Sequence, residues 1–263
     1  MKKISIFGVE VQSITLSQGI EEMKKLLHKG AGNTIYTPNT EIVMEARKDS
    51  SLCKLINQGD MIVADGIGLV IGSKLRGHPL PERVTGFDLS MELLKIGAEK
   101  GYSIFFLGGK PGVAEKAVEN VKKDYPDLKI AGFHHGYFKG THTGSPDHLE
   151  EKEVLQSIKA SNADILFVGF GFPKQEIWID KYKNILGTRL LIGNGGVIDV
   201  LAGEAKRAPK IFIQLHLEWF YRLLKNPSRW KRQLAIPKFL YYIVRDSNGV
   251  REIENRNEEE GFE

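Results

Sequence analysis

The sequence is poor in cysteine and contains no long apolar run. Cys53 is the only cysteine among 263 residues, so no internal disulfide can form, as is typical of proteins in a reducing compartment. No stretch of about 18 uncharged apolar residues is present, and the sequence therefore predicts no membrane-crossing helix. The basic and apolar N-terminal residues are interrupted by Glu10, too early for a signal peptide. We therefore expect a cytoplasmic protein.

Three motifs that bind nucleotides or metals are also missing. No glycine-rich turn is followed by Lys-Ser or Lys-Thr as in a Walker loop, and no Gly-x-Gly-x-x-Gly lies where a nicotinamide domain needs it. No Asp-x-Asp is available to hold Mg²⁺ against a diphosphate. His134, His135, His142 and His148 gather in one loop without cysteine, and we interpret them as solvated rather than as metal ligands. The sequence thus predicts neither a metal site nor a cofactor.

Short apolar runs alternate with amphipathic segments along most of the chain. The clearest strand predictions are 102–107, 128–133, 165–168 and 189–192, each followed by a helical pattern or a glycine turn. This rhythm predicts an α/β protein with a Rossmann-like, open and largely parallel sheet flanked by helices. We expect a catalytic core at 1–204, a helical appendage at 205–245 and a flexible acidic tail at 246–263.

The segment Met61-Ile62-Val63-Ala64-Asp65-Gly66 predicts a buried strand that delivers a carboxylate to the sheet edge where ligands bind. Asp65 can cap the following helix, or it can act as a base. Thr37 and Asn39 follow the preceding predicted strand, and if the two strands are neighbours these residues line the same cleft.

Three further strands end in glycine-rich turns, which expose backbone N–H groups to phosphate. The turns contain Gly108 and Gly109, then Gly169 and Gly171, and lastly residues 193–196 with Asn194 and Gly195. Together they predict a site for a nucleotide or a sugar phosphate, with simple tight turns as the alternative. Gln175 begins the helix after the second turn and can reach a ligand. Arg83 can meet the charge of a leaving diphosphate, or it can form a structural salt bridge.

The formal net charge is +4, and its distribution is uneven. Between Lys206 and Arg245 only Glu218 opposes the lysines and arginines, which suggests an anionic surface as partner. Aromatic residues that suit a membrane interface accompany them: Trp219, Phe220, Tyr221, Trp230, Phe239, Tyr241 and Tyr242. The alternative is a buried helical hairpin packed on the core.

These motifs together resemble the TagA/WecG/CpsF glycosyltransferase family, from about residue 3 to residue 245. The matching segments are Thr37-Pro38-Asn39-x-Glu41, Ala64-Asp65-Gly66-x-Gly68, Glu82-Arg83-x-x-Gly86-x-Asp88-Leu89, Phe106-Leu107-Gly108-Gly109, Gly169-x-Gly171-x-Pro173-Lys174-Gln175-Glu176, Ala202-Gly203, Arg207-Ala208-Pro209, Glu218-Trp219-x-x-Arg222-Leu223 and Pro227-x-Arg229-x-x-Arg232. The loop at 134–146 is longer than the family pattern leads us to expect.

The resemblance implies an inverting, metal-independent transferase that moves N-acetylmannosamine from UDP-ManNAc to the 4-hydroxyl of undecaprenyl-diphosphate GlcNAc, in the linkage unit of wall teichoic acid. It implies Asp65 as general base with Thr37 as polar partner, and Asn39, Arg83 and Gln175 as active-site polar residues. Arg222, Arg229 and Arg232 match arginines that close over the donor diphosphate.

The implied partners are the two substrates and the inner face of the cell membrane, with no nucleic acid and with homo-oligomerisation left open. One alternative is a transferase of the same family for another donor, UDP-ManNAcA or UDP-glucose. The other is a UDP-binding module that docks on membrane or nucleic acid and transfers nothing.

Overall fold

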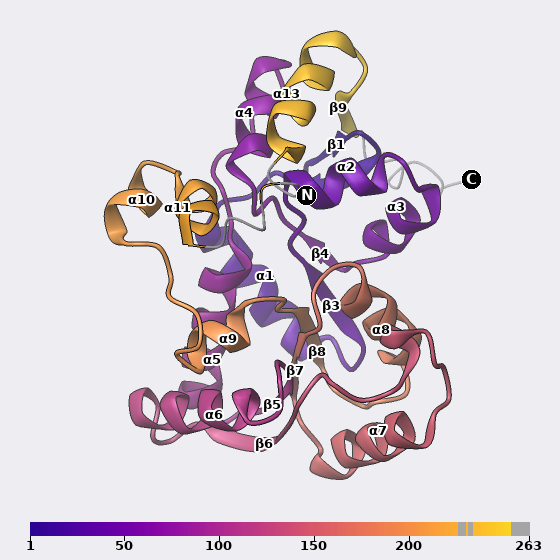
Figure 1. Ribbon diagram of the computed structural model, residues 1–263, viewed down its shortest axis with the longest axis vertical. Helices are drawn as coiled ribbons and strands as arrows, with labels where there is room; N and C mark the ends of the chain where they lie inside the picture. The colour runs from indigo at the N-terminus through magenta and orange to yellow at the C-terminus, as the bar shows by residue number, and fades with distance from the viewer. Residues whose placement is uncertain (226–229, 231–233, 254–263) are drawn as a thin grey trace, which may run out of the picture.

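The computed structural model describes residues 1–225, 230 and 234–253. Its centre is a six-stranded, entirely parallel sheet in the order β4-β3-β8-β7-β5-β6 (Figure 1). The strands are β3 (Asn33–Tyr36), β4 (Met61–Ile62), β5 (Ser103–Gly108), β6 (Lys129–His134), β7 (Ile165–Gly169) and β8 (Leu190–Gly193). The prediction of an open parallel α/β sheet is confirmed.

Helices cover both faces of this sheet, because successive strand residues point to opposite sides and both sides are apolar. In β5, Ile104 and Phe106 pack on one face, whereas Phe105 and Leu107 pack on the other. The first face is covered by α1 (Leu16–His28), α5 (Gly86–Lys100), α6 (Val113–Asp124) and α9 (Val197–Leu201). The second is covered by α7 (Leu149–Ser161) and α8 (Lys174–Tyr182).

The sequence predicts one or two short strands around Gly8 in residues 3 to 14, but their pairing into a second, antiparallel sheet was not predicted. Its order is β2-β1-β9, formed by β1 (Lys3–Ile6), β2 (Val9–Gln12) and β9 (Val250–Ile253). β9 lies within the segment that we expected to be a flexible tail, and that expectation is wrong for Val250–Ile253, because the backbone of these residues pairs with β1. The remainder of the predicted tail, 254–263, lies outside the described residues.

The C-terminal helices divide into two groups, so the predicted appendage is not uniform. α13 (Ala235–Arg245) packs beside α2 (Thr40–Ala46) and α4 (Ile67–Leu75), and α3 (Ser50–Asn57) joins the same end of the molecule (Figure 1). Phe239 and Ile243 of α13 are fully buried there. A Cβ on Gly72 would lie 2.7 Å from the Phe239 ring, so this glycine makes the close approach possible. Residues 235–245 therefore belong to the core.

The other group, α10 (Lys210–Gln214) and α11 (Glu218–Lys225), lies at the edge of the molecule (Figure 1). The sequence predicts a helical appendage here, and His216, which has a positive φ of 58°, separates the two helices. Several apolar side chains remain exposed on them: Ile211, Leu215, Phe220 and Leu224. Among the described residues, no helix is both long and apolar enough to span a bilayer.

Candidate active site

The ends of β3 and β4 bring Thr37, Asn39 and Asp65 together. The two strands are parallel neighbours, and hydrogen bonds from the Val63 amide to the Tyr36 carbonyl (3.1 Å) and from the Asp65 amide to the Pro38 carbonyl (3.0 Å) continue the pairing beyond them. The two strands are therefore neighbours, which was the condition for Thr37, Asn39 and Asp65 to line the same cleft.

Thr37 and Asn39 each have a local structural contact as well. The Asn39 side chain caps α2 by accepting a hydrogen bond from the amide of Ile42 at 3.1 Å. A Cβ on Gly86 would lie 2.8 Å from Oγ1 of Thr37, so this hydroxyl lies against the first residue of α5. Both side chains remain partly exposed.

Asp65 does not cap the next helix along the chain. The N-cap of α4 is Gly66, and no side chain caps that helix. Instead, Oδ2 of Asp65 accepts a hydrogen bond from the amide of Gly86 (3.1 Å), and Oδ1 accepts one from Nη2 of Arg83 (3.1 Å). The side chain is nevertheless 27% exposed, so the carboxylate is held in place and still open to a substrate.

Arg83 forms a structural salt bridge, which is the alternative to diphosphate binding that the sequence leaves open for this residue. Its Nε donates to the backbone carbonyl of Asp65 (2.6 Å), and its Nη2 also donates to Oε2 of Glu218 in α11 (2.9 Å). Burial alone would lower the pKa of the guanidinium, but Asp65 and Glu218 raise it above its ordinary value. Arg83 therefore stays cationic between two carboxylates.

The glycine turns after β5 and β7 lie against each other at the same edge of the sheet. A Cβ on Gly108, whose φ is +153°, would lie 2.6 Å from the carbonyl oxygen of Gly169. The amide of Gly109 donates to the same carbonyl at 3.3 Å. The turns can approach this closely only because these positions have no side chain.

Gln175 connects the second turn to the third. Its Oε1 accepts a hydrogen bond from the amide of Gly171 (3.1 Å), and a Cβ on Gly193 would lie 2.6 Å from its Nε2. Gly195 is exposed and lies close to both Gly171 and Gln175. Gln175 is itself buried, so in this conformation it shapes the turns.

Glu176, the neighbour of Gln175 at the start of α8, is a buried carboxylate. The residue is only 4% exposed; its Oε1 accepts from Nε2 of Gln175 (3.0 Å), and its Oε2 has no hydrogen-bond partner among the described residues. Burial raises the pKa of this carboxyl from 4.5 to about 7, against the smaller opposing effect of the Gln175 hydrogen bond. Glu176 is thus a buried, readily protonated group.

Asn194 is buried too, at 1% exposure, and connects the third turn to Asp65 through α5. Oγ of Ser90 lies 2.8 Å from Oδ1 of Asn194 and 2.6 Å from the carbonyl oxygen of Gly86, and its single hydrogen can be donated to either acceptor. Because Gly86 also donates its amide to Asp65, these polar contacts connect Asp65 to the turn after β8. Ser90 and Glu218 were not among the residues that we predicted for the site.

The three C-terminal arginines remain predictions. Arg222 belongs to α11, but the position of its side chain is not described, and Arg229 and Arg232 lie outside the described residues. Of the aromatic residues predicted for a membrane interface, Phe239 is buried in the core and Tyr242 is partly buried there, whereas Trp230 and Tyr241 are exposed.

The histidine loop packs against the second glycine turn. The His142 ring stacks on Phe170 with centroids 4.2 Å apart, and burial lowers its pKa. His142 is thus not the solvated residue that we expected, because the 134–146 loop folds back over Phe170. Within the described ranges, no three His, Cys, Asp or Glu residues are grouped so that they could hold a metal ion.

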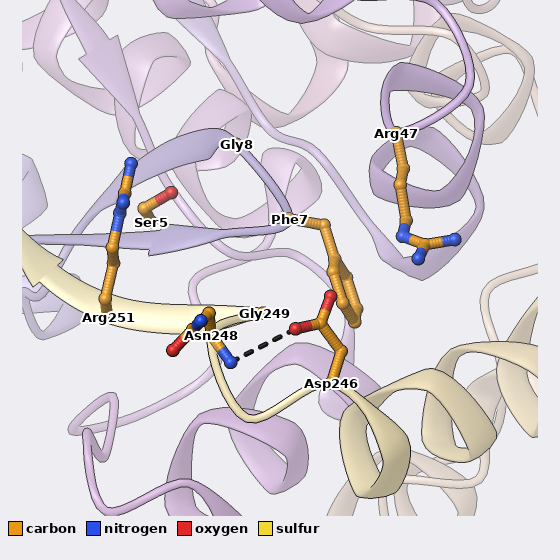
Figure 2. Close-up of a pocket in the computed structure, with 8 residues that line it drawn as sticks. All are labelled: Ser5, Phe7, Gly8, Arg47, Asp246, Asn248, Gly249 and Arg251. Atoms are coloured by element: carbon orange, nitrogen blue, oxygen red, sulfur yellow. Dashed lines mark hydrogen bonds between the residues drawn. The ribbon is translucent and has the colours of Figure 1, made fainter.

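A pocket of about 290 Å³ lies elsewhere, beside β1 and β9 (Figure 2). Figure 2 shows Arg47 and Arg251 on opposite sides of it, with Asp246 and Phe7 between them. None of the predicted site residues lines this pocket. The Arg47 guanidinium lies over the rings of Phe7 and Tyr242, which makes it part of the local packing.

Comparison with known proteins finds a family profile and named relatives that match most of the chain. A profile of the family described as "Glycosyl transferase WecG/TagA/CpsF family" matches residues 4–252. A protein of Bacillus spizizenii strain W23 is 40% identical over 219 residues, which cover 83% of this chain and 81% of the relative. Relatives from Bacillus subtilis strain 168 and Staphylococcus aureus strain MW2 are 34% and 37% identical and cover 94–95% of each chain. All three are named N-acetylglucosaminyldiphosphoundecaprenol N-acetyl-beta-D-mannosaminyltransferase.

Proposed function

Because the chain belongs to the WecG/TagA/CpsF family of glycosyl transferases, we propose that it transfers N-acetylmannosamine from UDP-ManNAc to the 4-hydroxyl of GlcNAc-diphospho-undecaprenol. The names of the three relatives support this acceptor and this sugar. The product is the disaccharide of the linkage unit of wall teichoic acid.

The placement of Asp65 is the observation that carries the proposal. Its carboxylate is fixed by the Gly86 amide and by Arg83, stays partly exposed, and lies beside Thr37 at the edge of the sheet that carries the glycine turns. A base in transfer chemistry needs this combination of fixed geometry and access. Open parallel sheets bind their ligands at this edge.

Asp65 acts as the general base of an inverting displacement. It accepts the proton of the GlcNAc 4-hydroxyl while that oxygen bonds to the anomeric carbon of ManNAc. The bond from this carbon to the UDP oxygen breaks on the opposite face, and its electron pair leaves with UDP. Such proton transfer typically contributes ~10²–10⁴-fold to the rate. Thr37 lies close enough to the base, across Gly86, to orient the acceptor, and Asn39 lies at the start of α2 beside it.

The charge of departing UDP is met without a metal ion in this proposal. The amides of Gly109 and Gly171 already have protein acceptors. The exposed backbone of Gly195 and Gly196 in the turn after β8 therefore faces the donor diphosphate, and Arg222, Arg229 and Arg232 close over it. Arg83 acts by holding Asp65, because its guanidinium already bonds that residue at two atoms.

The lipid tail of the acceptor requires the enzyme to work at the inner face of the cell membrane. The exposed apolar residues Ile211, Leu215 and Leu224, together with Trp230 and the surrounding basic residues, support contact with an anionic bilayer surface. Each lysine or arginine near such a surface contributes ~1 kcal/mol.

A donor panel tests the proposal. Purified protein receives a short-chain lipid-diphosphate GlcNAc with UDP-ManNAc, UDP-ManNAcA or UDP-glucose, each with and without EDTA, and the disaccharide is identified by mass spectrometry and NMR. We expect a β-linked ManNAc product that persists in EDTA. A product formed only from UDP-ManNAcA or UDP-glucose would show that the transferred sugar is not N-acetylmannosamine. Loss of activity in EDTA would contradict the metal-free mechanism.

A further inference from the structure

Glu218 is the one acidic residue in the basic segment 206–245, and it does not face solvent. It begins α11, and its side chain is only 6% exposed. Its Oε2 lies 2.9 Å from Nη2 of Arg83, across 135 residues of sequence. A carboxylate is seldom buried to this degree unless it is paired, so the contact specifies where α11 lies.

The hydrogen bonds of Arg83 show how its contact with Glu218 affects Asp65. Nη2 has two hydrogens, and it donates both to Oδ1 of Asp65 and to Oε2 of Glu218. Nε donates its single hydrogen to the backbone carbonyl of Asp65. Three of the five guanidinium donors are thus committed, which fixes the plane of the group. Glu218 holds it from the C-terminal side, and Asp65 holds it from the side of the sheet.

We propose that Glu218 is a positioning residue of the transfer reaction, which orients Arg83 and through it the Asp65 carboxylate. The inference rests on the proposed role of Asp65 as the base. Glu218 touches neither reacting atom; it couples the docking of α11 to the geometry of the base. Arg222 lies one helical turn after Glu218 in α11. The contact between Glu218 and Arg83 therefore also fixes the position of the helix that carries Arg222.

Kinetics of the full-length enzyme test the proposal with Glu218→Gln. The variant keeps the size of the side chain and removes the charge from its bond to Arg83. Because Asp65 works as a base only while the proton is being transferred, kcat and kcat/KM are expected to fall together by about 10- to 100-fold. Glu218→Asp keeps the charge and is expected to retain more of kcat than Glu218→Gln.

A double-mutant cycle separates positioning from general damage to the fold. Arg83→Gln lowers kcat by itself, and adding Glu218→Gln to it is expected to change kcat by less than about twofold, since the partner is already absent. Glu204→Gln is the matched control, because Glu204 forms an exposed ion pair with Lys116 (2.7 Å) and is expected to leave kcat unchanged. Thermal unfolding of each variant reports whether it is folded at the assay temperature.

Amide hydrogen exchange of 218–225 without substrates gives a readout that does not depend on the donor. Exchange there is expected to be faster in Glu218→Gln and in Arg83→Gln, but not in Glu204→Gln. Wild-type kcat in Glu218→Gln, an effect on KM alone, or additive losses in the double variant would overturn the inference. If the wild type transfers no ManNAc but amide exchange of 218–225 is still faster in Glu218→Gln and Arg83→Gln, the proposed function is wrong, whereas the role of the Glu218–Arg83 contact in holding α11 is supported.

Discussion

Replacing Glu176 by Gln is expected to make the protein more stable above pH 7 and to flatten the dependence of its stability on pH. Burial raises the pKa of this carboxyl from 4.5 to about 7, so the folded protein holds a proton that the unfolded chain has already lost. Between these two pH values the folded state binds more protons, and its stability therefore falls as pH rises. At about 1.4 kcal/mol for each pH unit, the free energy of unfolding loses about 3 kcal/mol by pH 8.

Glutamine has the same shape as the protonated carboxyl but cannot ionise. Its side-chain oxygen can still accept the 3.0 Å hydrogen bond from Gln175, so the local packing is retained. Urea unfolding at pH 5, 6, 7 and 8 measures the free energy of unfolding for wild type and Glu176→Gln. Glu153→Gln, an exposed residue of α7, serves as the control. Parallel curves for wild type and Glu176→Gln across this range would refute the reasoning.

Two further substitutions test the glycine turn and the polar contacts of Ser90. Gly108→Ala places a Cβ 2.6 Å from the Gly169 carbonyl oxygen, and it is expected to reduce UDP binding in calorimetry and to lower the melting temperature. The control is Gly112→Ala, also at positive φ but in open space, which is expected to cost about 1 kcal/mol of stability and to keep UDP affinity. Equal effects of the two substitutions would contradict the close-approach argument. Ser90→Ala removes the hydroxyl that lies against both the Asn194 amide oxygen and the Gly86 carbonyl, and it is expected to lower the free energy of unfolding by about 1–3 kcal/mol in urea. An unchanged value would show that this hydroxyl contributes nothing to stability.

The central sheet could be predicted from the sequence because its strands are buried on both faces. Such strands appear as continuous apolar runs, and β5, β7 and β8 lie at the predicted positions. The glycine turns at their ends could be predicted for a related reason. Strand ends at one edge of a parallel sheet approach each other closely, and at Gly108 and Gly169 only glycine leaves enough room.

The second sheet could not be predicted, because β9 has almost no local signal. Its four residues, Val250–Ile253, include the exposed Arg251 and Glu252 in a stretch rich in glutamate. Only pairing with β1 makes this segment a strand. The same holds for α13, whose Phe239 is buried because Gly72, far away in sequence, leaves space for its ring.

At the site, the residue types could be predicted but not all of their partners. Asp65 follows its strand as expected, whereas its hydrogen bond to Gly86 depends on where α5 begins in space. The pairing of Glu218 with Arg83 spans 135 residues and has no local signature beyond a single acid in a basic segment. Nothing near Glu176 in the sequence indicates its burial, which results from the packing of α8 on the sheet.

The rate of UDP release by Asp65→Asn, with UDP-ManNAc and the lipid-linked acceptor, tests the central claim most directly. Asparagine keeps the shape of the side chain but cannot accept the proton of the acceptor, so kcat is expected to fall by ~10²–10⁴-fold. UDP affinity in calorimetry should be retained, and Asp124→Asn, at the exposed end of α6, should behave as wild type. Wild-type turnover in Asp65→Asn would contradict the account and leave Asp65 with a structural role only.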